Sequence, residues 1–145
     1  MSLLSQILAA EEDEAEAIGD SLNPTDLWSG IGLRELTIPR LVMLHSLVTG
    51  ESFDDAVAQY EPVYVSSEEG TWVLRLADVL MARLASLDDE RLEAIAAELA
   101  ATEVFETAGW SEDEVAGMLA DLAELAQLAE SQGQVLFAWL HPLPV

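Results

Sequence analysis

The chain has 145 residues, of which 28 are acidic and five are basic, giving a formal net charge of −23. All five basic residues are arginines and cysteine is absent, which excludes disulfides, thiol catalysis, lysine Schiff bases and the lysine-dependent phosphate loop. Direct binding to nucleic acid is not expected either, because phosphate contacts need a basic surface.

The hydrophobic fraction of 51% is high enough for a packed core despite this charge, which argues against disorder. The length predicts a single domain over residues 1–145, and we expect this domain to be acidic and mainly helical. No apolar run approaches the length of a membrane span, and residues 1–10 lack the basic start of a secretory signal. We therefore expect a soluble cytoplasmic protein that does not contact membranes.

The arginines are confined to one part of the chain, whereas the acidic residues are spread over all of it. Every arginine lies between Arg34 and Arg91, so the first 33 residues and everything after Arg91 contain no positively charged side chain. We expect both ends of the chain to carry a strong negative potential and each arginine to face several carboxylates.

The N-terminal segment has apolar residues at helical spacing, which predicts a first helix over residues 3–18 that stops at Gly19. Residues 11–16 are so acidic that like charges repel across successive turns, so residues 1–20 are expected to form a loosely attached helix. The apolar face would consist of Leu3, Leu4, Ile7, Leu8, Ala15 and Ile18.

A connecting loop is expected next, because Asn23-Pro24 and Gly30-Ile31-Gly32 are typical of turns; this loop carries Trp28. The following helix is predicted to begin near Thr37 and to stop at Gly50. Its buried face would hold Leu41, Leu44, His45 and Val48.

A short helix reaching about residue 59 is predicted next, with Ser52 and Asp55 as its cap. Residues 62–65 and 71–75 then alternate in polarity around a polar loop and predict a β-hairpin. The chain is expected to return to helix from about residue 79, and Asp88 is placed to cap a further helix.

The C-terminal part carries the strongest local signals. Ser111 and Glu114 have the spacing of a capping box at the start of a long helix, and Gly133 is a natural stop. Leu128 falls outside the apolar stripe of this helix, so we expect the last turns to contact a second neighbour. Residues 135–140 are short, apolar and aromatic, which predicts a buried strand.

These elements together predict a mainly α fold of the α+β class. Five or six helices would pack with a small antiparallel hairpin or sheet that includes the C-terminal strand. No long linker and no internal repeat divides the chain.

Residues 44–50, Leu-His-Ser-Leu-Val-Thr-Gly, resemble the L-H-x-x-L-T-G segment of the YfbM-like family of small uncharacterised bacterial proteins. The later order of elements is similar as well: a strand leading into a helix from Trp72, a tryptophan before the long helix, and an apolar terminal strand. The resemblance extends loosely over residues 36–140 and implies no particular reaction.

His45 is the only residue whose position invites a catalytic interpretation, because a neutral imidazole on an apolar helix face could serve as a base. The alternative, which we favour, is a core histidine with satisfied hydrogen bonds. His141 lies among the terminal prolines and is expected to be exposed. The acidic runs lack the calcium-loop pattern and the histidines lack metal-site spacing, so no metal or other cofactor is expected.

Aromatic residues beside acidic ones are the candidates for a binding surface. We single out Trp28 and Tyr60, which would suit an interface if exposed, together with Glu68 and Glu69 as part of an acidic rim.

Three hypotheses for function remain open. The first is a non-catalytic interaction protein, of an adaptor or toxin-neutralising type, that presents an acidic surface to a basic protein. The second is an enzyme that uses His45 with a nearby carboxylate. In the third, the acidity is only an adaptation to a saline or compositional background. The sequence leaves the oligomeric state open, a homodimer included.

Overall fold

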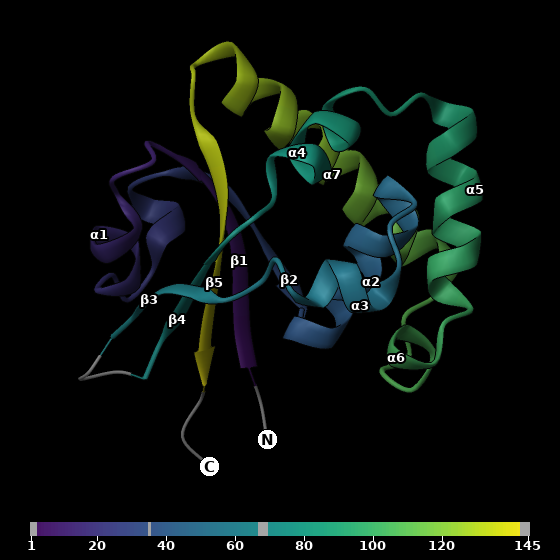
Figure 1. Ribbon diagram of the computed structural model, residues 1–145, viewed down its shortest axis with the longest axis horizontal. Coiled ribbons are helices and arrows are strands. Elements are labelled where there is room, and N and C mark those ends of the chain that lie inside the picture. The colour runs from purple at the N-terminus through teal and green to yellow at the C-terminus, as the bar shows by residue number, and fades with distance from the viewer. Residues whose placement is uncertain (1–2, 35, 67–69, 143–145) are drawn as a thin grey trace.

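The computed structural model of the chain describes residues 3–34, 36–66 and 70–142. A five-stranded antiparallel sheet lies at its centre, with strand order β2-β1-β5-β4-β3. The N-terminal and C-terminal strands therefore lie side by side in the middle of the sheet (Figure 1). The strands are β1 (Leu3–Ala10), β2 (Ser29–Arg34), β3 (Pro62–Val65), β4 (Trp72–Arg75) and β5 (Val135–Pro142).

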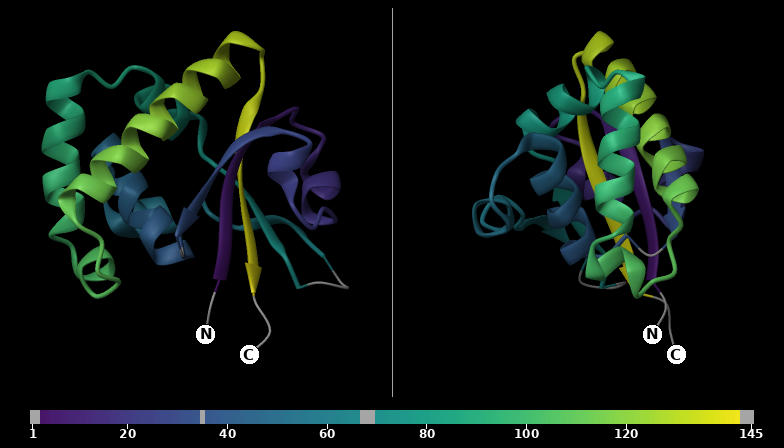
Figure 2. Two further views of the ribbon diagram at one scale, coloured as in Figure 1. Left: turned by 180° about the vertical axis from the view of Figure 1, so that it is seen from behind. Right: turned by 90° about the vertical axis from the view of Figure 1, so that its right-hand side faces the viewer.

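Seven α-helices and one 3-10 turn occur within the described residues. Helices α2 and α4 to α7 gather on one side of the sheet, and the short α1 lies on the other (Figures 1 and 2). The helices are α1 (Ala15–Gly19), α2 (Ile38–Thr49), α3 (Phe53–Val57), α4 (Asp78–Ala85), α5 (Asp89–Ala100), α6 (Glu103–Glu106) and α7 (Glu112–Ser131), and the turn is η1 (Pro24–Asp26). No helix in these ranges is long and apolar enough to cross a membrane.

Both faces of the two central strands are buried, because successive side chains of a strand point to opposite sides. Ile7 of β1 and Leu136 of β5 belong to the larger cluster under the helices. Leu8 and Trp139 belong to a smaller cluster on the opposite face, where Ile18 of α1 covers them. The sheet thus separates a large core from a small one.

The prediction of five or six helices with a small hairpin or sheet is wrong, as is the predicted helix over residues 3–18. Residues 3–10 form β1, which pairs with β2 on one side and β5 on the other. A strand buried on both faces has an almost continuous apolar sequence, and periodicity cannot distinguish such a run from a buried helix. Only residues 15–19 of the predicted segment are helical.

Two further elements were not predicted. Gly30-Ile31-Gly32 lies within β2, not in a connecting loop, and the four-residue helix α6 precedes Trp110. Gly30 pairs with Leu8 of β1, where an added Cβ would lie 2.6 Å from the carbonyl oxygen of Ile7. Gly30 therefore permits the close approach of β1 and β2. The sequence pattern had instead indicated that this glycine is part of a turn.

The predictions that rest on local caps are confirmed. Helix α2 begins after Thr37, whose side chain accepts from the backbone N–H of Arg40, and it ends at Gly50 with a φ of 82°. Helix α7 has both hydrogen bonds of the capping box formed by Ser111 and Glu114. The β3–β4 hairpin and the C-terminal strand β5 are also present.

Candidate functional site

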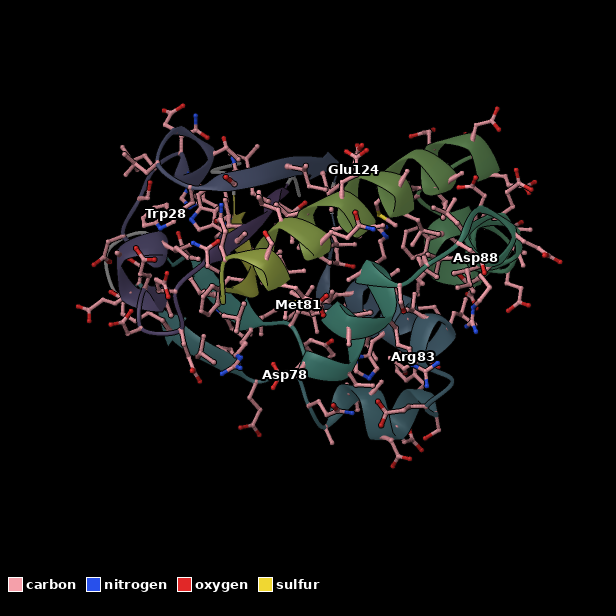
Figure 3. All side chains as sticks on the ribbon, turned by 90° about the horizontal axis from the view of Figure 1, so that it is seen from above. Trp28, Asp78, Met81, Arg83, Asp88 and Glu124 are labelled. Atoms are coloured by element: carbon pink, nitrogen blue, oxygen red, sulfur yellow. The ribbon has the colours of Figure 1, made fainter. Side chains whose placement is uncertain are left out.

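An open cleft of about 620 Å³ lies at the edge of the sheet, between β2 with the segment before it and one face of α7. We call it the acidic cleft. Figure 3 labels Trp28 and Glu124, which come from its two walls, in the upper half of the view. The lining residues are Thr25, Asp26, Leu27, Trp28, Ser29, Gly30, Ile31, Asp121, Glu124, Leu125 and Leu128.

The wall contributed by α7 follows from helix periodicity. Asp121, Glu124, Leu125 and Leu128 are spaced i, i+3, i+4 and i+7, so they lie along one stripe of the helix. Leu125 is buried at the base of this stripe, whereas Leu128 is 36% exposed. Across the cleft from Leu128 lies the segment formed by residues 25–31.

The opposite wall is held in place by side chains from β1 and from the loop before α1. Gln6 of β1 accepts from the backbone N–H of Thr25 at 3.2 Å and donates to the side chain of Asn23 at 2.9 Å. The indole N–H of Trp28 donates to Glu14 at 3.0 Å, and its ring packs against the smaller core cluster. Trp28 is thus fixed in orientation and half-buried at the cleft.

The electrostatics of the cleft are one-sided. Asp26, Asp121 and Glu124 are exposed carboxylates, and no arginine is among the described side chains that line the cleft. Residues 25–31 and 121–128, which form the two walls, contain no positive side chain, and the cation nearest to them in sequence is Arg34 at the far end of β2. Beside these carboxylates, Leu27 is 74% exposed. The cleft therefore combines negative potential with accessible apolar surface.

His45 lies in a different place, inside the larger core, and is fully buried. Its Nδ1 is 2.7 Å from the phenol oxygen of Tyr60, and its Nε2 is 2.6 Å from Oε1 of Glu51. The rings of His45 and Tyr60 meet edge to face. An imidazole protonated on Nε2 donates to Glu51 and accepts the phenol proton on Nδ1, which satisfies both nitrogens.

The electrostatic shifts in this network have separate causes. Burial raises the pKa of the Tyr60 phenol well above its ordinary value, which keeps it protonated as a donor. The hydrogen bond from His45, followed by that from Gln59, lowers the pKa of Glu51. Among the clefts formed by the described residues, none of those characterised is lined by His45. The hydrogen bonds of His45 with Tyr60 and Glu51 fix the orientation of the imidazole within the core.

The remaining candidate residues are distributed as follows. Tyr60 is buried, with 5% of its surface exposed, so it presents no side chain for an interface. Glu68 and Glu69 lie outside the described residues. His141 is half-buried at the end of β5, where its Nδ1 is 2.8 Å from the hydroxyl of Thr71. Of the two predicted binding residues that the structure describes, Trp28 lines the acidic cleft.

Sequence reasoning missed the contribution of α7 to the cleft. The usable signals were Leu128, which lies off the main apolar stripe, and the acidic pair formed by Asp121 and Glu124 one turn apart.

In the part of the chain that the structure describes, no three histidine, aspartate or glutamate side chains are grouped as they would be around a metal ion.

The sequence matches no protein-family model and is similar to no functionally curated protein. Among solved structures, the chain is similar to YfbM from Escherichia coli, a protein of unknown function. The sequence identity is 14%, the alignment covers 94% of this chain and 99% of that chain, and the TM-score is 0.46. The distant YfbM-like resemblance predicted from residues 44–50 is thereby confirmed. It supports no inference about function.

Proposed function

We propose that this protein is a non-catalytic interaction protein that binds a basic protein partner through the acidic cleft. The observation that carries the proposal is that, among the described residues, three carboxylates and an exposed leucine line one concave surface that holds no arginine. An adaptor or a toxin-neutralising protein would use such a surface, because charge complementarity accelerates association and disfavours wrong partners. A cytoplasmic location belongs to the same proposal.

The chemistry of the cleft defines the partner segment that fits it. Arginine or lysine side chains would pair with Asp121 and Glu124, and their aliphatic stems or neighbouring apolar residues would contact Leu27 and Leu128. Trp28, which is half-buried at the cleft, is of a residue type that often dominates interface energetics. A nucleic acid or an anionic membrane would instead be repelled by these carboxylates.

If the acidity is only an adaptation, removing two exposed carboxylates should have the same effect on binding wherever they lie on the surface. The chain offers a matched comparison. Asp121→Asn with Glu124→Gln removes two charges from the cleft, and Glu93→Gln with Glu98→Gln removes two from exposed positions of α5. Asp88, beside the start of α5, lies at the opposite end of the molecule from Trp28 in Figure 3.

The test uses a defined probe, an eight-residue peptide of alternating arginine and valine with blocked ends, titrated into the protein at low salt. We expect binding that weakens as salt rises. The cleft variant should raise Kd by roughly two- to thirty-fold, the range for losing two exposed ion pairs, while the α5 variant should leave Kd within about twofold. Equal losses in both variants, or no binding by the native protein, would refute the proposal.

A further inference from the structure

The wall of the acidic cleft formed by β2 is the free edge of the central sheet. Strand β2 pairs with β1 on one side, and residues 3–34, 36–66 and 70–142 place no strand on its other side. On an edge strand every second residue turns its N–H and C=O away from the sheet. Among the described residues, the backbone of Ser29, Gly30 and Ile31 makes no hydrogen bond outside the ladder with β1. The cleft therefore contains unpaired backbone donors and acceptors as well as carboxylates.

The two edges of the sheet differ in how they are protected. Strand β3, at the other edge, begins with Pro62 and has an irregular register between Pro62 and Tyr64. Proline and bulges are the features by which proteins keep edge strands from pairing. Strand β2 has neither, because its register with β1 is continuous from Arg34 to Ser29 and it contains no proline. The β2 edge, which lies beside the carboxylates of the acidic cleft, is therefore the edge that can pair with another strand.

The side chains of β2 leave room for such a strand. Gly32 is exposed, and a Cβ added to it would meet no atom within 4 Å. On the opposite face, Ile31 packs against the larger core near α7, where Leu125 and Leu128 continue the apolar surface. A polypeptide lying along β2 would thus direct alternate side chains toward α7 and toward the glycine face.

From this geometry we infer that the acidic cleft binds its partner as an extended, cationic segment that adds a sixth strand to the free edge of β2. The inference rests on the proposed function and specifies the conformation of the bound segment. Backbone hydrogen bonds to β2 provide affinity that does not depend on sequence, and the α7 stripe selects side chains, as in other complexes formed by strand addition. With six residues in β2, the bound segment spans about 20 Å.

A second copy of the chain is disfavoured as the occupant of this edge. Each chain carries a net charge of −23, and pairing two β2 edges would bring the carboxylates of both clefts together. Like charges brought together in this way oppose association and are weakly screened at low salt. A cationic segment reverses the sign of this interaction, so charge complementarity selects a basic partner.

The experiment compares three forms of the alternating arginine–valine octapeptide that have identical charge. One is unmodified, one is N-methylated at every arginine, and one is N-methylated at every valine. In an extended strand the backbone N–H groups of one alternate set face the protein, so one methylated form should bind at least tenfold more weakly and the other should bind within about threefold of the unmodified peptide. Amide hydrogen exchange should also slow at alternate residues of β2 when the unmodified peptide is bound.

Each outcome decides one question. A single weakened isomer together with protection of β2 supports strand addition. Equal binding of all three peptides, still reduced by Asp121→Asn with Glu124→Gln, would overturn strand addition and leave the proposed function standing. No binding by any peptide at low salt would overturn both. A stable dimer in sedimentation, with β2 amides protected before peptide is added, would assign the edge to a second copy and overturn the inference.

Discussion

The hydrogen bond between Tyr60 and His45 is the most direct test of how the larger core accommodates a polar group. Substituting Tyr60→Phe removes the phenol oxygen that lies 2.7 Å from Nδ1 of His45 and keeps the aromatic ring that packs against the imidazole. His45 is fully buried and Tyr60 is 5% exposed, so water has no open path to replace the missing donor. The variant isolates one hydrogen bond with almost no loss of apolar packing.

The expected cost follows from leaving a buried acceptor without a partner, which is about 1–3 kcal/mol. The hydroxyl also accepts a long hydrogen bond from the backbone N–H of Ala77, at 3.5 Å, whose loss adds little. For a chain of this size, 1 kcal/mol lowers Tm by roughly 2–4 °C. We therefore expect Tyr60→Phe to lower Tm by roughly 2–12 °C.

The assay is urea unfolding at pH 7 followed by circular dichroism, with thermal unfolding alongside it. Tyr64→Phe is the matched control, because its hydroxyl donates to Asp20 at 2.7 Å in an exposed position where water can substitute. The control should change the free energy of unfolding by no more than about 0.5 kcal/mol. If Tyr60→Phe proved as stable as the control, the buried phenol–imidazole bond would not be a requirement of the core, and the reasoning would fail.

Three further predictions concern stability. Because the hydrogen bond from His45 holds the pKa of Glu51 below its ordinary value of 4.5, this carboxylate stabilises the fold above that pH and loses its effect as pH falls through the folded pKa. The difference in unfolding free energy between the native protein and Glu51→Gln should therefore be larger at pH 7 than at pH 3, and a constant difference would contradict this. Gly30→Ala should destabilise the protein by about 1–3 kcal/mol, since its Cβ would lie 2.6 Å from the carbonyl oxygen of Ile7, whereas Gly32→Ala should be nearly neutral; equal effects in urea unfolding would show that β1 and β2 do not approach as described. With a net charge of −23, the free energy of unfolding should rise between about 0.01 M and 1 M NaCl as the Debye length falls from roughly 30 Å to 3 Å, and a flat salt profile would show that the carboxylates do not repel one another appreciably.

The sequence alone determined the elements whose signals are local. Thr37 and Gly50 bound α2, and Ser111 with Glu114 begins α7, because a cap depends on residues within one turn of it. The alternation on either side of residues 66–70 likewise identified the hairpin. The negative character of both chain ends also needed only the positions of the arginines.

The tertiary structure decided which segments lie together. Strand β1 pairs with β5 from the far end of the chain, and burial on both faces gave β1 an apolar sequence that also fits a helix. The same pairing makes β2 an edge strand and places it beside Leu128 of α7, which is how the acidic cleft arises. His45 was visible in the sequence as a polar residue on an apolar face, but its partners Tyr60 and Glu51 are set by how α2 packs with the chain that follows it. Periodicity and caps report on a few neighbouring residues, whereas a sheet edge and a cleft depend on contacts between residues far apart in the chain.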